Sequence, residues 1–578
     1  MLKKFYAKRS CTVDGRTYNA GEIVMSETEV DGLERANDEQ RPAKTKKKRY
    51  ERNARLGERN PELSVVVTFH NQLEFVDQCL DSFHRQNFDE AYEVIAVIDK
   101  SEQAEAEYIK KHFPTVDVCE VSYGNANKAR NFGLSVARGK YVAFFDGDDY
   151  AYGNYLLKLR QALRDNPSAT FSYARFEHEL YGLSFGSLPR CNVFEWNKSW
   201  AKFSPITNTP ILIYRDRAPK WDERLEIMQD AGYCLELTKA GFTGVHVREE
   251  LWHYRNHKGG IWNQAGIAER RANANEILRN EYGFRNEPAK VTFVSLISRD
   301  VVLDEYFGQI KTLGLPPETH WFILVDSNQE PFIEKIKAYQ AEHEGQFLSS
   351  RMFVTGEDSL SYSRDFESRG MRIANFIKII INQAAQKMGG SEFLFMVEDD
   401  TLVPENAYGR LLPLIKRGHK TVYASGIECG RGFTKHTGIC WLKKNDKGEI
   451  TGRTIPSMKT LKGVVEIGGG GWYCWIGRAR ELQHWTTRMP MRCFDGKMLG
   501  PDVMMAHDLQ QFGYSCLCDT TLQCDHYDER RKVWLPASTG KGYDIEYYKD
   551  KSGDWKMLLK ETDDATAGIV HEMKMPKL

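Results

Sequence analysis

Carboxylates gather at two places in the chain, each directly after a run of apolar residues. The segment FFDGDD carries Asp146, Asp148 and Asp149, and the segment MVEDD carries Glu398, Asp399 and Asp400. Carboxylates packed this closely repel one another unless a cation neutralises them. Oxygen ligands with open coordination positions suit Mn²⁺ or Mg²⁺ held jointly with a diphosphate. We therefore predict a divalent cation, and with it a phosphorylated ligand, at each cluster.

Strand and helix patterns lead up to the first cluster. The β-branched run from residue 63 is typical of a strand buried on both faces of a parallel sheet, and residues 73–83 place apolar side chains at helical spacing. A second buried run, YEVIAVID, ends at Asp99. Because ligands of open α/β sheets bind beyond the carboxyl ends of the strands, we expect Asp99 to contact a nucleotide's ribose or base.

The same pattern restarts near residue 290 and runs up to the second cluster. The segment KVTFVSLIS predicts a strand, DEYFGQIKTLG a helix, and THWFILVDSN a strand that ends at Asp326, the counterpart of Asp99. Either acidic strand end alone could be a solvated turn. Two of them at equivalent points of two βαβ repeats favour two related binding sites.

The repeat divides the chain into five predicted parts. These are a small β-rich appendage (1–40), a basic linker (41–62), a first α/β domain (63–285), a second α/β domain (286–535) and a C-terminal extension (536–578). Within the appendage, two short β-like runs precede SETEVDGLERAN (26–37), which begins like a capped helix. The two large domains therefore hold the chemistry.

The order of SVVVTFHN, VIDKS and NKARNFGLSVARGKYVAFFDGDD resembles the inverting family-two glycosyltransferases of the GT-A fold. The resemblance covers residues 63–260 with good motif specificity and 290–530 with weaker specificity. It implies two tandem GT-A domains, which are Rossmann-like nucleotide-diphospho-sugar transferase domains, with a nucleotide-sugar donor of the UDP-sugar type and Mn²⁺ or Mg²⁺. By this resemblance Arg130 and Asn131 lie near the diphosphate or sugar. The implied metal ligands are Asp146 and Asp148 in the first domain and Glu398 and Asp400 in the second.

The family's catalytic base opens a helix, eleven residues before a glycine that an aromatic residue follows. Both halves of the chain satisfy this spacing: Asp230 precedes Gly241, and Asp502 precedes Gly513. The resemblance therefore implies that Asp230 and Asp502 take the proton from the attacking acceptor hydroxyl. A helix-capping role is the alternative for each, because aspartate is favoured at helix starts in any case.

The family ends its domain with a histidine that completes the metal shell. In the second half His526 lies twelve residues after Tyr514, as the resemblance implies. In the first half the segment LWHYRNH offers His253 or His257, and we favour His257. A structural role is the alternative for both histidines.

Glycines and aromatic residues lie close together in EIGGGGWYCWIGR. Glycines let a backbone approach a ligand closely, and aromatic rings stack on sugar or base faces. We expect Trp472, Tyr473 and Trp475 to form a platform for the acceptor. The alternative is a loop packed by its own aromatic rings.

Composition limits the classes of partner and compartment. The chain of 578 residues carries 80 basic and 80 acidic side chains, so no overall charge draws it to nucleic acid or anionic membrane. No apolar run reaches the length of a signal peptide or a membrane span, which predicts a soluble cytoplasmic protein. The 12 cysteines are expected to be reduced thiols. One group, Cys516, Cys518, Cys524 and His526, does not have the spacing of a zinc site.

Three functions remain open from the sequence. The first is a bifunctional, metal-dependent inverting glycosyltransferase that acts on a glycan or polysaccharide. The second has the same chemistry on hydroxymethylated bases of DNA, as in some bacteriophage enzymes, and the basic run at residues 44–55 favours it. The third is a chain in which one domain is a non-catalytic scaffold that binds nucleotide sugar or acceptor.

Overall fold

The architecture is that of a computed structural model. It describes residues 56–57, 60–180, 183–185, 193–257, 260, 266–285, 288–355, 366–385, 390–428, 438–447, 450–455, 461–485, 487, 491–492, 498–528 and 532–535, together with strands within 3–35 and 543–574. The basic run at residues 44–55 lies outside the described residues. The chain forms two compact units, Met1–Arg52 and Asn53–Leu578.

The N-terminal unit is built from short strands. They are β1 (Lys3–Ala7), β2 (Cys11–Val13), β3 (Arg16–Tyr18), β4 (Ile23–Ser26) and β5 (Leu33–Arg35), in one sheet of order β4-β1-β5 and one hairpin β2-β3. The helix expected within residues 26–37 is wrong, because Leu33–Arg35 pairs antiparallel with β1. Pairing along the edge of β1 outweighs the local capping signal there.

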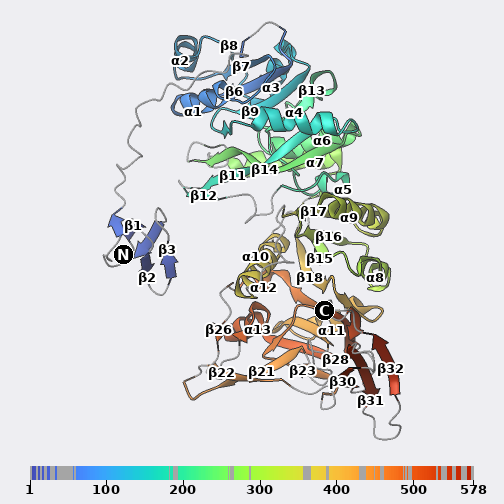
Figure 1. The fold of residues 1–578 in the computed structure, drawn as a ribbon. Helices are drawn as coiled ribbons and strands as arrows, with labels where there is room; N and C mark the ends of the chain where they lie inside the picture. The colour runs from blue at the N-terminus through green and yellow to red at the C-terminus, as the bar shows by residue number, and fades with distance from the viewer. Residues whose placement is uncertain are drawn as a thin grey trace. The chain divides into compact units, whose positions relative to one another are not determined.

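A first sheet occupies the region of the first predicted GT-A domain. Its strands are β6 (Leu63–Phe69), β7 (Tyr92–Asp99), β8 (Val116–Val121), β9 (Tyr141–Asp146), β10 (Tyr150–Ala151), β11 (Phe171–Leu180), β12 (Leu183–Phe185), β13 (Ile211–Tyr214) and β14 (Gly244–Asn256). Its helices are α1 (Leu73–His84), α2 (Glu105–His112), α3 (Ala126–Val136), α4 (Tyr155–Asp165), α5 (Lys198–Ala201), α6 (Gln229–Lys239) and α7 (Ile267–Tyr282). We call these elements the first module (Figure 1).

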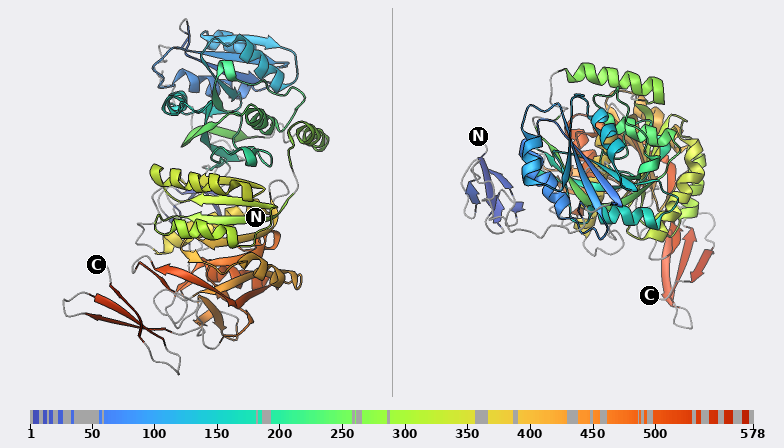
Figure 2. Two further views of the ribbon diagram at one scale, coloured as in Figure 1. Left: turned by 90° about the vertical axis from the view of Figure 1, so that its right-hand side faces the viewer. Right: turned by 90° about the horizontal axis from the view of Figure 1, so that it is seen from above.

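A second sheet follows the same plan. Its strands are β15 (Ala289–Ile297), β16 (Thr319–Val325), β17 (Ser349–Val354), β18 (Ser391–Glu398), β19 (Thr401–Leu402), β20 (Thr421–Glu428), β23 (Val464–Glu466), β25 (Cys474–Arg478), β28 (Ser515–Asp528) and β29 (Val533–Leu535). Its helices are α8 (Leu303–Gln309), α9 (Glu330–His343), α10 (Phe366–Ala384), α11 (Ala407–Lys416), α12 (Ala479–Leu482) and α13 (Pro501–Gln511). These elements are the second module (Figure 2).

Strand order shows that the second module repeats the first. The first sheet runs β8-β7-β6-β9-β13-β11-β14-β10, and the second runs β17-β16-β15-β18-β25-β20-β28-β19. Antiparallel strands take the same two places in each sheet: β13 lies between β9 and β11 as β25 lies between β18 and β20, and β10 pairs with β14 as β19 pairs with β28. The tandem α/β architecture predicted from the sequence is therefore confirmed.

Close packing of α3 on β6 fixes the helix that carries two predicted site residues. A Cβ on Gly133 would lie 2.2 Å from Val66 Cγ1, so only glycine allows this approach. Ala129 is fully buried on the same helix. Arg130 and Asn131 lie in the middle of this helix, which packs against β6 and β7.

Three further groups of strands were not predicted as such. The segment from Gly426 to Lys462, which the sequence left unassigned, contains β21 (Ile439–Lys444) and β22 (Ile450–Thr454), and these form a sheet with β24 (Gly469–Gly470). Strands β26 (Met491–Arg492) and β27 (Met498–Leu499) form a small hairpin. The C-terminal extension forms an antiparallel sheet of β30 (Tyr543–Lys549), β31 (Trp555–Glu561) and β32 (Ile569–Lys574) (Figure 2).

Direct hydrogen bonds join the two modules. The guanidinium of Arg175, on β11, donates to the carbonyl oxygens of Val354 and Thr355 at the end of β17. The backbone N–H of Glu195 donates to the carbonyl of Met352 at 3.0 Å. Arg175 is only 2% exposed, so this contact is part of a continuous interior. Among the described helices, none is both long and apolar enough to cross a membrane.

Candidate active site

The turn after β9 presents the first carboxylate cluster. Strand β9 pairs parallel with β6, in register from Leu63 with Tyr141 to Thr68 with Asp146. Gly147 then turns the chain, since a Cβ there would lie 2.3 Å from the Phe69 ring and 2.8 Å from the Thr68 carbonyl oxygen. The glycine lets the chain turn tightly enough to place Asp148 beside Asp146 at the sheet edge.

Arg130 links the acid cluster to the start of helix α6. Its guanidinium donates to Asp146 Oδ1 at 2.6 Å and to Gln229 Oε1 at 3.1 Å. It also donates to Asn127 Oδ1 at 2.9 Å and lies 4.6 Å from the centre of the Trp221 ring. The side chain of Arg130 is buried, whereas that of Asp146 is 27% exposed. A positive charge is thus held at the sheet edge in a fixed position.

Asp148 and His257 meet at the same edge. His257 Nε2 lies 3.0 Å from Asp148 Oδ2, and the two side chains are 23% and 20% exposed. The hydrogen bond to Asp148 raises the pKa of His257. The predicted pairing of a cluster aspartate with His257 is therefore present, and both groups remain open to solvent.

Asp149 is the buried member of the cluster. Its carboxylate accepts the backbone N–H of Arg255 at 2.8 Å. Burial raises the pKa of Asp149 well above its usual range, and the nearby charges of Asp148 and Asp146 raise it further. The cluster thus holds more negative charge than its surroundings stabilise, which favours an added cation.

Asp230 lies close to this cluster on helix α6. Met228, the residue just before this helix, has φ 57°, a left-handed conformation that is uncommon outside glycine and marks sites where structure constrains the backbone. Thr209 Oγ1 donates to Asp230 Oδ1 at 2.6 Å. Burial, together with the charge of Asp146, raises the pKa of Asp230 to about 6, although the Thr209 hydrogen bond opposes this rise. A carboxylate with that pKa suits general base catalysis near neutral pH.

Asp99 and Asn131 make protein contacts at the same edge. Asp99 accepts three backbone N–H groups, from Tyr123 at 2.6 Å, Gly124 at 2.9 Å and Asn125 at 2.8 Å. Asn131 exchanges hydrogen bonds with the backbone of Trp221, at 2.9 Å and 2.8 Å. Both side chains therefore shape the loops around the predicted nucleotide position. Contact with the nucleotide itself stays a prediction.

The first cluster fits a divalent cation whose coordination a diphosphate completes. Asp148 and His257 offer carboxylate oxygen and imidazole nitrogen ligands that solvent can reach. Within the described part of the chain, no group of three or more histidine, cysteine or acidic side chains encloses a metal position by itself. Mg²⁺ and Mn²⁺ sites in transferases commonly take one or two protein ligands and the rest from phosphate and water.

In the second module the cluster has a different environment. Arg299 Nη2 lies 2.5 Å from Asp399 Oδ1, and Arg299 Nη1 lies 2.7 Å from Asp400 Oδ2. His526 Nε2 lies 3.3 Å from the same Asp400 oxygen. The predicted proximity of Asp400 and His526 is present. However, the side chains of Asp399 and Asp400 are only 3% and 1% exposed.

The other predicted residues of the second module lie at the end of a strand or at the start of a helix. Glu398 is the last residue of β18, and its N–H donates to the Tyr473 carbonyl. Asp502 is in the first turn of α13, as Asp230 is in α6. Asp326 follows β16 and is buried, and Thr355 Oγ1 donates to its Oδ1 at 2.6 Å. Their roles stay predictions.

The structure contradicts the aromatic platform. Trp472, Tyr473 and Trp475 are 6%, 1% and 0% exposed. Trp475 stacks on Tyr423 with 5.5 Å between ring centres, and the Tyr473 hydroxyl donates to the Gly426 carbonyl at 3.1 Å. The rings fill the core of the second module and leave no face for an acceptor. The cysteines Cys516, Cys518 and Cys524 are likewise buried, as expected for reduced thiols.

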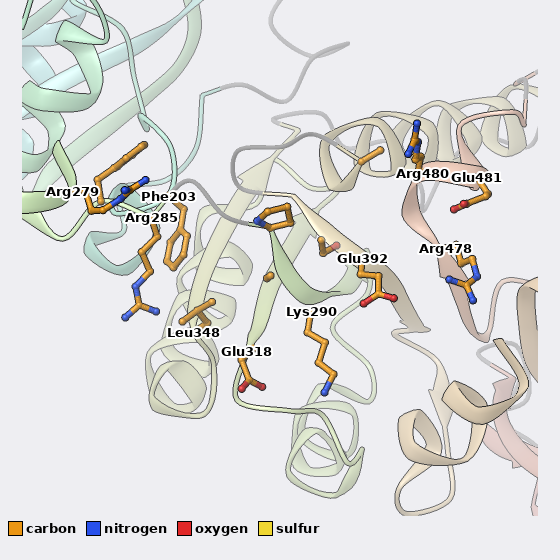
Figure 3. A pocket seen from close by; sticks show the side chains of 15 residues that line it. Phe203, Arg279, Arg285, Lys290, Glu318, Leu348, Glu392, Arg478, Arg480 and Glu481 are labelled. Atoms are coloured by element: carbon orange, nitrogen blue, oxygen red, sulfur yellow. The ribbon is translucent and has the colours of Figure 1, made fainter. Parts of the chain in front are cut away.

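A large open cavity lies at the amino-terminal ends of strands in the second sheet, opposite the ends that carry the carboxylates. Its volume is about 1090 Å³, and its lining includes Arg285, Lys290, Glu318, Glu392 and Arg478 (Figure 3). Ala289 and Ser391, which also line it, begin strands β15 and β18. None of the predicted site residues lines this cavity, and its mixed charges select no ligand class.

Sequence reasoning missed several residues of the first site. The Arg255 guanidinium donates to the Asp148 carbonyl, Thr209 binds Asp230, and Tyr254 has its pKa raised by burial and by the cluster carboxylates. Tyr254 and Arg255 could have been found, because they stand beside His257 in LWHYRNH. Thr209 lies on a connecting segment with no motif, so no sequence signal marks it.

Comparison with known proteins agrees with this geometry. The family model for glycosyl transferase family 2 matches residues 64–214. A poly(ribitol-phosphate) beta-glucosyltransferase of Bacillus spizizenii is 33% identical over 112 residues, which are 18% of this chain and 18% of that protein. The uncharacterized glycosyltransferase YibD of Escherichia coli is 34% identical over 131 residues, which are 22% of this chain and 38% of that protein. The chain thus spans less than two fifths of the length of either relative.

A solved structure aligns over more of the chain. The crystal structure of Staphylococcus aureus TarS covers 87% of this chain and 89% of its own, with 12% identity and a TM-score of 0.32. The shorter match at residues 64–214 contains Asp99, Arg130, Asn131, Asp146 and Asp148 and ends before Asp230. By this match, residues 64–214 of the chain are similar to glycosyl transferase family 2.

Proposed function

We propose that the chain is a metal-dependent, inverting glycosyltransferase and that its first module transfers a sugar from a nucleotide-sugar donor to an acceptor hydroxyl. One observation carries this proposal. Arg130 contacts both Asp146 and Gln229, the neighbour of Asp230, so a general base and the carboxylate cluster share one site. In this arrangement Asp230 would act on an acceptor hydroxyl beside a donor bound at Asp146 and Asp148.

The first module would divide the reaction between these groups. Asp230, ionised above its raised pKa of about 6, accepts the proton of the acceptor hydroxyl. The acceptor oxygen forms a bond to the anomeric carbon as the bond from that carbon to the diphosphate oxygen breaks. The electron pair of the broken bond leaves with the nucleoside diphosphate. Attack opposite the leaving group inverts the anomeric centre.

Positive charge near the leaving group supports this displacement. Arg130 keeps its guanidinium on Asp146, and Asp148 with His257 would hold the cation. When bound, Mn²⁺ or Mg²⁺ would neutralise charge that develops on the departing diphosphate. A UDP-sugar is the donor that the sequence resemblance implies. A nucleotide sugar is also the donor class of related solved structures, which include a UDP-GlcNAc complex and a GDP-Man complex with Mn²⁺.

A hydroxyl-rich polymer is the acceptor we favour. Two relatives are named as poly(ribitol-phosphate) glycosyltransferases, one of Bacillus spizizenii and one of Staphylococcus aureus. The alternative acceptor, hydroxymethylated DNA, rests on the basic run at residues 44–55, on the small N-terminal appendage and on the lack of an apolar run long enough to span a membrane. That run is outside the described residues and adds no support. Activity of both modules was the sequence-based expectation, and the second module is considered below.

Donor and acceptor can be tested together. The full chain is incubated with Mn²⁺ and a panel of UDP- and GDP-sugars, and released nucleoside diphosphate is measured with poly(ribitol phosphate), with oligosaccharides or with hydroxymethylated DNA. We expect release with a UDP-sugar that a polyol-phosphate or glycan acceptor stimulates, and that Asp230→Asn abolishes. If only hydroxymethylated DNA stimulated the release of nucleoside diphosphate, DNA would be the acceptor in place of a glycan or polyol phosphate. Absence of release with every donor would reject the enzymatic proposal.

A further inference from the structure

The cation position of the second module is closed by an arginine of the chain itself. Strands β15 and β18 are paired with Leu296 opposite Glu398, as Thr68 is opposite Asp146 in the first module. Three residues after each paired position stand Arg299 in the second module and Asn71 in the first. An uncharged amide in one module is thus replaced by a guanidinium in the other.

Arg299 forms ion pairs with two of the three acids of the second cluster. Its two terminal nitrogens lie 2.5 Å from Asp399 Oδ1 and 2.7 Å from Asp400 Oδ2. Asp399 also accepts the N–H of Ser298 at 2.7 Å and its hydroxyl at 3.2 Å. A guanidinium that bridges two carboxylates supplies fixed positive charge with directional hydrogen bonds, and it is always protonated. The pair of acids therefore needs no added cation.

Solvent access distinguishes the modules independently of charge. In the first module the side chains of Asp146, Asp148 and His257 are 27%, 20% and 23% exposed. In the second module the side chains of Asp399, Asp400 and His526 are 3%, 1% and 3% exposed. A diphosphate that shares a metal with these carboxylates must reach them from solvent. The first cluster offers two carboxylates to that approach, whereas the second offers only Glu398, which is half-buried.

We infer that the second module does not bind a divalent cation at its carboxylates and that the chain holds one catalytic metal, in the first module. Of the residues that the sequence resemblance implied as metal ligands there, Asp400 and His526 are buried beside Arg299 and do not fit a metal, which leaves Glu398 as the single half-buried carboxylate. Asp400 and His526 instead belong to a buried charge cluster that Arg299 neutralises and that fixes the turn between β18 and β19. This inference rests on the proposed function, because the family resemblance is what suggested a metal in each module.

Manganese stoichiometry tests the inference on the full chain. Free Mn²⁺ is measured by electron paramagnetic resonance during titration with saturating UDP. We expect one Mn²⁺ per chain. Asp148→Asn should weaken that binding by at least about tenfold, because it removes one of the few protein ligands. Asp400→Asn should leave one ion bound. Two ions per chain, with one lost in Asp400→Asn, would overturn the inference.

Removal of the guanidinium gives a second, positive test. Arg299→Met leaves Asp399 and Asp400 without their positive charge and should create a second Mn²⁺ site, whereas Arg299→Lys should keep one. Arg85→Met, at an exposed arginine of α1, is the matched control and should also keep one. A folded Arg299→Met protein that binds only one ion would overturn the role given to Arg299. Failure of the proposed function would look different: no bound Mn²⁺ and no donor turnover in the parent protein.

Discussion

Thr209, which lies inside the family-two match of residues 64–214, donates its hydroxyl hydrogen across 2.6 Å to the carboxylate of Asp230, which lies beyond that match. This hydrogen bond stabilises the ionised form of Asp230 and lowers its pKa, while burial and the charge of Asp146 raise it. The balance leaves the pKa of Asp230 at about 6. A base tuned in this way accepts a proton near neutral pH and is still ionised beforehand.

The first prediction concerns pH. Because Asp230 must be ionised to accept a proton, kcat/KM should rise as pH rises through about 6 and level off above it. Thr209→Val removes the hydrogen bond that favours the ionised form, so the rising limb should move to higher pH. Thr207→Val is the matched control, since that hydroxyl bonds to the Asn208 carbonyl and not to Asp230. Initial rates from pH 5 to 9 measure both, and an unshifted limb in Thr209→Val would remove Asp230 from the base role.

The second prediction concerns the base itself. Asp230→Asn keeps the size of the side chain and its contact with Thr209 but cannot accept the proton. Turnover should fall by roughly 10²–10⁴-fold, with little change in the dissociation constant of the nucleotide sugar. Asp502→Asn is the counterpart in the second module and should leave transfer by the first module unaltered. Single-turnover rates and calorimetric donor binding separate the two quantities. If Asp230 only capped the helix, Asp230→Asn would lower the free energy of unfolding and leave turnover unchanged.

The third prediction concerns Arg130. Its buried guanidinium connects Asp146, Gln229 and Asn127, and replacement by methionine keeps the bulk but removes the charge. We expect turnover to fall by about 10²-fold or more, as for loss of one preorganised charge at a leaving group. Arg85→Met, which removes an exposed ion pair with Asp81 far from the proposed chemistry, should be indistinguishable from the parent. Equal turnover in both variants would contradict the proposed site.

The fourth prediction concerns the buried aromatic residues of the second module. Trp475→Ala should lower the free energy of unfolding by roughly 3–5 kcal/mol, because a fully buried ring is lost and a cavity remains. The Michaelis constant for the acceptor, measured where the variant is still folded, should not change. If the Michaelis constant for the acceptor rose at least tenfold in a stable Trp475→Ala protein, the aromatic platform would again be supported.

Sequence patterns predicted the architecture well because the parallel strands are buried on both faces and so read as continuous apolar runs. Strands β6, β7 and β9 begin and end close to the predicted positions, with Asp99 and Asp146 at their ends. Loop-dependent features could not be predicted. The aromatic residues after the glycine run look alike whether they face solvent or the core, and only packing against Tyr423 and Trp485 decides between these alternatives.

The replacement of a metal position by an arginine was also invisible to motif reading. Glu398 and Asp400 preserve the spacing of acidic residues, and His526 preserves the distal histidine. The neutralising group, Arg299, stands about a hundred residues earlier and reaches the acids only because β15 and β18 are neighbours in the sheet. Partners joined by strand pairing across such a separation leave no local signal in one sequence.

Arg175 sets a limit on how the chain can be divided. Its guanidinium is buried between the modules and donates hydrogen bonds to the backbone carbonyl oxygens of Val354 and Thr355. A protein cut between the two halves would leave this guanidinium and both carbonyls without these hydrogen bonds. Leaving such groups unsatisfied costs roughly 1–3 kcal/mol each. Each half made alone should therefore be less stable than its own core suggests, and the second half acts as a folding partner of the first even where it binds no metal.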